Sequence, residues 1–166
     1  QADAKYKRYI GNGAPKHFLS WSNNLTWRNF DLSVFFRGTF GFDVFNMRKY
    51  GMGLQGCGTD NVLRSAYLED KNIRTGGGVI SSYFLEDGSF IKLENVTLGY
   101  NFTPKNRKLL DNMRIYLSAK NLFTLTGYSG NDPSIIDVNG IQPGVDSNSA
   151  YPTATQLSLG VTLRFK

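Results

Sequence analysis

The 166-residue sequence has one cysteine and one histidine. Cys57 alone cannot form an intramolecular disulfide, so a disulfide-stabilised scaffold is excluded, and we interpret Cys57 as a small loop residue. His17 lies between Lys16 and Phe18 in a polar stretch. A general base needs a partner within hydrogen-bond reach, and the sequence offers His17 none that can be identified. We therefore expect no catalytic site and no cofactor.

Long apolar runs are also absent. No segment approaches eighteen consecutive apolar residues, which excludes a transmembrane helix. A β-barrel remains possible, because strands that alternate apolar and polar residues cross a bilayer with low mean hydropathy. The chain begins with Gln1 and shows no basic and apolar signal segment, so we expect a mature or truncated chain.

The charge is unbalanced but not concentrated. The net charge is +6, with 19 Lys and Arg against 13 Asp and Glu. A nucleic-acid-binding domain usually gathers its basic residues into one patch, whereas these are scattered along the chain. We expect no nucleic acid partner.

Aromatic residues and glycines are abundant: aromatics make up 14% of the sequence, and there are 18 glycines. This mixture favours strands joined by turns. The clearest strand is the last, where Leu157, Leu159 and Val161 alternate with polar residues. Alternation of this kind predicts about five long strands. They lie near residues 19–28, 30–41, 89–102, 113–125 and 155–166.

The connections between these strands are unequal in length. The first is very short and the third is modest, whereas residues 42–88 and 126–153 form long connections. Transmembrane barrels have short periplasmic turns and long outer loops, so we expect the two long connections to be extracellular and the C-terminus to be periplasmic. The predicted fold is all-β: an antiparallel transmembrane β-barrel portion with long extracellular loops that contain short helices.

Local features are predicted within these segments. In the first long loop, Thr59 or Asp60 would cap a short helix that contains residues 62–67. Residues 83–85 and 90–91 would form a small hairpin around an Asp-Gly turn. The apolar parity of residues 89–102 changes midway, which predicts a β-bulge near Glu94 and Asn95.

Candidate site residues follow from this topology. The second outer loop offers aromatic and hydrogen-bonding groups suited to sugars or peptides: Tyr128, Asn131, Asp132, Gln142, Asn148 and Tyr151. Basic residues predicted to face the barrel lumen are Arg37, Lys92, Arg114 and Lys120. Aromatic residues at the inner strand ends predict an interfacial girdle: Trp27, Phe30, Tyr100, Phe102 and Phe165.

Acidic residues suggest two other kinds of site, a calcium site and a glycosidase active site, with weaker support. Asp132, Asp137 and Asp146 could supply oxygen ligands to calcium, but their spacing matches no known loop motif, so we expect no metal site. The acid pairs at 69–70 and 86–87 do not suit a glycosidase, because adjacent residues on a strand point to opposite faces.

Three stretches carry a resemblance to one known family: 10–16 with 30–33 and 38–41, then 86–100, then 114–125 with 128–133. Together they resemble the SusC/RagA-type TonB-dependent outer-membrane transporters. The end of the chain also resembles the C-terminal signature recognised by the barrel-assembly machinery, through Ser158, Gly160, Leu163 and Phe165, although Lys166 follows the final aromatic residue.

The resemblance implies a longer protein. Family members have an N-terminal plug that carries the TonB box and a barrel of about 22 strands. The resemblance therefore implies that residues 1–166 are a C-terminal part of the barrel, without the plug and the remaining strands. It further implies import of oligosaccharides or peptides across the outer membrane, a SusD-like surface lipoprotein as partner, and energy from the TonB complex. A soluble β-sandwich or lectin-like binding module is the alternative, and it leaves the strand lengths and loop asymmetry unexplained.

Overall fold

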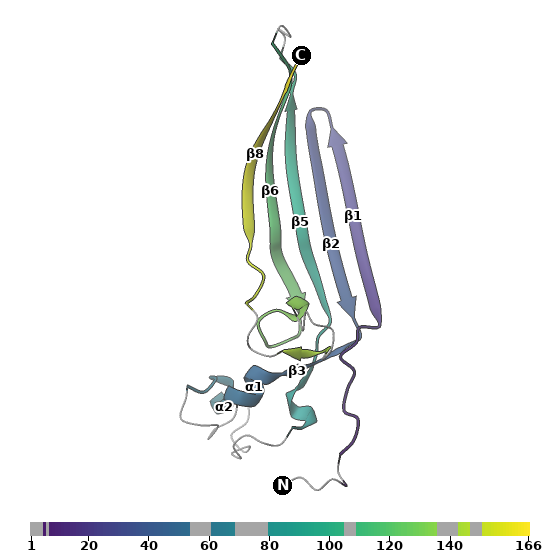
Figure 1. Cartoon of the computed structure of the whole chain (residues 1–166), viewed down its shortest axis with the longest axis vertical. Coiled ribbons are helices and arrows are strands. Elements are labelled where there is room, and N and C mark those ends of the chain that lie inside the picture. The colour runs from purple at the N-terminus through teal and green to yellow at the C-terminus, as the bar shows by residue number, and fades with distance from the viewer. Residues whose placement is uncertain are drawn as a thin grey trace. The chain divides into compact units, whose positions relative to one another are not determined.

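The fold is that of a computed structural model (Figure 1). It describes residues 5, 7–53, 61–68, 80–104, 109–135, 143–146 and 151–166. The chain divides into two compact units. The loop unit comprises residues 1–17, 40–90 and 126–152, and the sheet unit comprises residues 18–39, 91–125 and 153–166.

The sheet unit is built on five long strands. Figure 1 shows them side by side with alternating arrows, in the order β1-β2-β5-β6-β8. Their bounds are β1 His17–Trp27, β2 Phe30–Phe40, β5 Phe90–Phe102, β6 Leu110–Thr126 and β8 Gln156–Phe165. The predicted antiparallel all-β class is confirmed. The largest difference from the predicted bounds is at the start of β6, which begins at Leu110 instead of Met113.

The register of β6 and β8 separates apolar from polar residues. Leu117 lies opposite Leu159 and Ile115 opposite Val161, whereas Ser118 lies opposite Ser158. Directly opposed residues share a face of the sheet, so both strands contribute their apolar residues to one face and their polar residues to the other. The apolar face is exposed, with Leu159 at 76%.

Two cross-strand contacts explain the change of parity in β5. Asp31 and Arg37 are six residues apart on β2, so they share a face. Asp31 accepts a hydrogen bond from Asn101, and Arg37 pairs with Glu94. Glu94 and Asn101 are seven residues apart, so they can share a face only if β5 has one extra residue between them, as the predicted bulge requires.

The loop unit contains a second, smaller sheet. Its strands are β3 Asp43–Asn46, β4 Leu85–Asp87 and β7 Val145–Asp146, in the order β4-β3-β7. The helices are α1 Met47–Met52 and α2 Ser65–Leu68, with 3-10 turns at η2 Ser82–Phe84 and η3 Pro133–Ile135. Strand β3 is antiparallel to β4 and parallel to β7. Phe42, Val44, Phe90 and Tyr128 form a buried cluster in this unit.

The predicted hairpin in the first long loop is wrong. Residues 85–87 pair with β3, with Asp43 opposite Asp87, and not with residues 90–91 as a hairpin. The Asp87 carboxylate instead accepts hydrogen bonds from the amide and hydroxyl of Ser89, an Asx turn that ends the strand. The predicted short helix is present in part as α2, and its expected caps at 59–60 lie outside the described residues.

No helix among the described residues is long and apolar enough to span a membrane.

Candidate functional site

The polar face of the sheet carries a network of charged side chains. Arg114 Nε lies 3.2 Å from Asp31 Oδ1, and its Nη2 bonds the other carboxylate oxygen. Asn101 donates to Asp31 Oδ1 at 2.8 Å, so three strands meet at one carboxylate. A Cβ on Gly99 would lie 2.6 Å from both Asp31 oxygens, so a larger residue at this position would have to displace the Asp31 carboxylate.

The four residues predicted to face the lumen all contribute to this polar face. Arg114 and Lys120 lie opposite Thr162 and Gln156 on β8. Arg37 Nε pairs with Glu94 at 3.0 Å. Lys92 is 2% exposed, and its ammonium bonds the hydroxyl of Thr153. Asp31 and Glu94, which complete the two ion pairs, were not among the candidates.

Some rings of the predicted aromatic girdle contact one another. The rings of Trp27 and Phe30 are 6.5 Å apart and nearly parallel, and the rings of Phe30 and Tyr100 are 4.8 Å apart. Phe102 and Phe165 are exposed by 43% and 62%. Arg28 connects β1 and β2 with a positive φ of 54°, and its guanidinium lies over Trp27. Whether these rings meet a membrane interface remains a prediction.

The residues of the predicted assembly signal occupy defined positions on β8. Ser158 lies opposite Ser118, Gly160 opposite Tyr116, and Leu163 opposite Met113. Phe165 lies opposite Leu110. These contacts give Gly160 a packing role, because the Tyr116 ring occupies the space that a side chain at residue 160 would fill. Recognition by assembly machinery remains a prediction.

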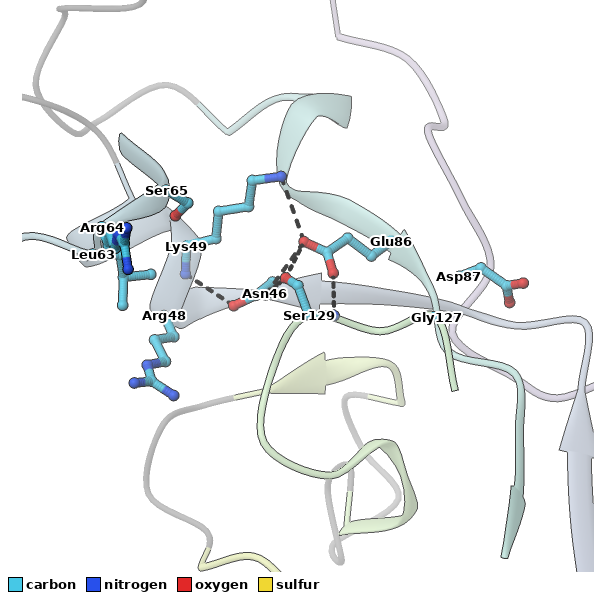
Figure 2. A pocket seen from close by; sticks show the side chains of 10 residues that line it. All are labelled: Asn46, Arg48, Lys49, Leu63, Arg64, Ser65, Glu86, Asp87, Gly127 and Ser129. Carbon is cyan, nitrogen blue, oxygen red and sulfur yellow. Dashed lines mark hydrogen bonds and ion pairs between the residues drawn. The ribbon is translucent and has the colours of Figure 1, made fainter. Parts of the chain in front are cut away.

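A pocket of about 610 Å³ lies in the loop unit (Figure 2). Basic residues from two segments line it: Arg48 and Lys49 on α1, and Arg64 just before α2. Asn46 caps α1 by accepting from the amide of Lys49 at 2.9 Å. The amide of Leu63 donates to the carbonyl of Met52 at 2.7 Å, which holds the second segment next to the end of α1.

Glu86 organises the opposite wall of this pocket. Its Oε2 accepts from the amide of Ser129 and its Oε1 from the Ser129 hydroxyl, both at 2.8 Å. The side chain of Lys49 extends toward the same carboxylate, with Nζ 3.5 Å from Oε1, as Figure 2 shows. Asn46 Nδ2 lies within 3.4 Å of Oε1. A segment after β6 is thereby fastened to β4 and α1 through one side chain.

The second-loop candidates separate into buried and exposed residues. Tyr128 is 5% exposed and donates its hydroxyl to Asp146 Oδ2 at 2.6 Å. Burial and the hydrogen bond to Asp146 raise the pKa of Tyr128 well above its ordinary range, so the phenol stays protonated. Asp132 is 7% exposed and accepts from the amide of Ser134. The predicted contact of these two residues with a ligand is therefore wrong, because both side chains are buried.

Other candidates keep accessible side chains. Asn131 is exposed and accepts a hydrogen bond from Arg48 Nη1 at 2.7 Å. Tyr151 is 92% exposed. Gln142 and Asn148 lie outside the described residues. Sequence reasoning missed Arg48, Lys49 and Arg64, since nothing in their spacing shows that the two segments meet.

The calcium alternative receives no support from the described residues. Asp146 and Asp132 both accept hydrogen bonds from the protein, and Asp137 lies outside the described ranges. In the described part of the chain, no three His, Cys, Asp or Glu residues come together as metal ligands.

Comparisons with known proteins bear on both units. No protein-family model matches the chain. TonB-dependent receptor P3 of Formosa agariphila is 26% identical over an alignment of 180 residues, which covers 96% of this chain and 17% of the receptor. TonB-dependent receptor SusC of Bacteroides thetaiotaomicron is 28% identical over 156 residues, covering 89% of this chain and 15% of SusC. Over most of its length, the chain is similar to SusC-type TonB-dependent receptors.

Solved structures agree with the fold of this chain. The RagAB peptide importer in its "closed-closed" state superposes with a TM-score of 0.78 at 24% identity, over 98% of this chain and 19% of the importer chain. Its "open-open" state gives a TM-score of 0.77. The chain spans 15% to 18% of the length of the curated relatives that it matches.

Proposed function

We propose that this chain forms part of the wall and two outer loops of an outer-membrane TonB-dependent importer for oligosaccharides or peptides. The β6–β8 ladder carries the proposal. Its apolar side chains alternate on one exposed face, with Leu157, Leu159 and Leu163 exposed by 71%, 76% and 47%. The five long strands have 10 to 17 residues, whereas a tilted strand crosses a bilayer with about nine to eleven.

The remaining strands of the same receptor are the first partner. Strands β1 and β8 end the described five-stranded sheet, and each presents unpaired backbone groups along its outer edge. In hydrocarbon every unpaired group costs several kcal/mol, so a lipid-facing sheet of this kind needs further strands on both sides. The similarity to TonB-dependent receptors supports a barrel of about 22 strands around a plug.

The other partners are proposed from the similarity to TonB-dependent receptors and to the RagAB importer. A SusD-like surface lipoprotein would cover the extracellular end, and the TonB complex would act through the plug. Outer-membrane lipid would contact the apolar face, while the polar face with Arg37, Lys92, Arg114 and Lys120 would border the transport path. Asn131 and Tyr151, with Gln142 and Asn148, remain candidate contacts for substrate or lipoprotein. The name of the RagAB peptide importer favours peptides, and oligosaccharides are the other class of the proposal.

A soluble sandwich or lectin-like module is the competing function. In a sandwich, the apolar residues of each strand pack against a second sheet. Here the large apolar residues of β1 are exposed as well, with Phe18 at 75% and Trp27 at 67%. Expressed alone, a sandwich would fold in buffer as a monomer, whereas the barrel portion should aggregate or require detergent. A soluble, cooperatively unfolding monomer would contradict the proposed function.

The orientation is tested by labelling the full-length receptor in intact cells. In a Cys57→Ser background, Tyr151→Cys should react with a membrane-impermeant maleimide, because residue 151 is exposed in the proposed outer loop. Lys166→Cys should react only after the outer membrane is permeabilised. The reverse pattern would place the C-terminus outside and overturn the orientation. Uptake of substrate should also stop when TonB is deleted.

A further inference from the structure

We propose that the pocket between α1 and the segment before α2 binds a carboxylate group of the ligand. The inference deepens the proposed function, on which it rests, by assigning a substrate class to the importer: peptides or sugars that carry carboxylates.

The acidic residues of the pocket are already satisfied by the protein. Both oxygens of Glu86 accept hydrogen bonds from Ser129, and Lys49 lies 3.5 Å away. Asp87 Oδ1 accepts from the amide and the hydroxyl of Ser89, at 2.9 and 2.6 Å. These carboxylates therefore hold strands and loops together and are poorly placed to attract a cationic ligand.

Lys49 is likewise engaged. Its ammonium approaches Glu86 and also lies 4.5 Å from the centre of the Tyr83 ring. A cation held between a carboxylate and an aromatic face is largely compensated. The charge available to a ligand must come from the two arginines.

Arg48 and Arg64 supply that charge. Among the described residues, Arg48 Nη1 bonds a neutral oxygen, that of the Asn131 amide, at 2.7 Å. Arg64 is exposed. Within the described ranges, no ion pair joins the guanidinium of Arg48 or of Arg64 to a carboxylate. A guanidinium presents a rigid fork that matches a carboxylate through two parallel hydrogen bonds, which makes a carboxylate a better ligand here than a neutral hydroxyl.

The segments that carry the two arginines are fixed by backbone contacts. The Leu63 to Met52 hydrogen bond joins them, and Ala66, two residues after Arg64, is buried with 1% exposure. Asn46 holds the start of α1. Because the backbone is held on both sides, little ordering is needed when a ligand binds, and this favours affinity.

The test measures binding to the purified full-length receptor in detergent. The probes are hexaglutamate and trigalacturonate, with hexaglutamine amide and methyl-esterified trigalacturonate as their neutral counterparts. We expect at least one acidic probe to bind about tenfold more tightly than its neutral counterpart, with affinity falling as salt rises. The peptide pair and the sugar pair distinguish the two sources of the carboxylate. Equal binding of acidic and neutral forms in both pairs would overturn the inference.

Matched variants locate the binding site. Arg48→Gln and Arg64→Gln should each remove most of the preference for the acidic probe. Arg8→Gln is the control, because Arg8 is an exposed arginine of the same unit that does not line the pocket. An equal loss in all three variants would show a general charge effect and contradict the site. TonB-dependent uptake of acidic and neutral substrates alike would refute the inference but leave the proposed function intact, whereas TonB-independent uptake would refute the function.

Discussion

The ring of Tyr116 on β6 lies over Gly160 on β8, and the two residues are directly opposite in the ladder. A Cβ at residue 160 would lie 2.3 Å from Tyr116 Cζ, closer than van der Waals contact allows. The same ring receives the Arg114 guanidinium at 5.2 Å from its centre. Gly160 therefore lets an aromatic side chain cross from one strand to the next on the polar face.

Gly160→Ala should destabilise the receptor by about 1–3 kcal/mol, because the added methyl group must displace the ring. Urea unfolding of the receptor in lipid vesicles would measure this. Combining the change with Tyr116→Ser should remove most of the penalty, since the obstructing ring is gone. An unchanged penalty in the double variant would mean that Gly160 acts through something other than this packing.

The Asp31–Arg114 pair gives a second prediction. Arg114→Met removes the bidentate partner and leaves the Asp31 carboxylate with Asn101 as its remaining side-chain donor in this network. The pair is partly exposed, with side-chain exposures of 26% and 35%. We therefore expect a loss of about 1 kcal/mol in the urea experiment, near the lower end for a charge-assisted bond. Adding Asp31→Asn should recover part of it, and a fully additive double variant would argue against coupling.

The long strands were predictable because their signal is local. In β8 every second residue is apolar, and period-2 alternation determines which side chains share a face before any partner strand is known. The parity change in β5 was visible for the same reason. The ends of the strands differ from the predicted bounds by up to three residues, as at Leu110. There, hydrogen bonding to β8 extends β6 beyond its alternating segment.

The loop unit was not predictable in this way. Strand β3 pairs in parallel with β7 about 100 residues later, and this contact leaves no periodic trace in either short segment. Tyr128 was a plausible ligand contact by composition. Its burial depends on Phe42, Val44 and Phe90, which come from two other parts of the chain. The pocket likewise depends on a meeting of Arg48 and Arg64 that only the folded chain reveals.

The two faces of β8 should respond differently to charge. Leu159 lies on the exposed apolar face opposite Leu117, and Ser158 lies on the polar face opposite Ser118. Leu159→Arg should cost about 2–4 kcal/mol if that face meets the middle of the bilayer, whereas Ser158→Arg should cost little. The amount of folded receptor recovered in outer-membrane fractions and its unfolding in urea would report both. Similar effects of the two variants would contradict the assigned faces.

The buried phenol of Tyr128 leads to a prediction about alkaline pH. Its pKa is raised first by burial and then by the hydrogen bond to Asp146, so the folded state retains the proton more strongly than the unfolded state. The stability that this group contributes is fully present below its unfolded pKa of about 10. Above that pH it falls, because unfolding then releases the proton. The rate of proteolysis of this loop in the intact receptor should therefore rise steeply above pH 10.

Tyr128→Phe separates the phenol from the ring. The variant keeps the packing against Phe42 and Val44 but loses the 2.6 Å bond to Asp146, which should cost about 1–3 kcal/mol at neutral pH. It should also lack the alkaline rise in proteolysis that Tyr128 causes. Tyr151→Phe is the control, because its side chain is 92% exposed and should change neither quantity. If Tyr128→Phe retained the full alkaline rise, another group would have to be responsible, and the buried Tyr128–Asp146 bond would not control the opening of this loop.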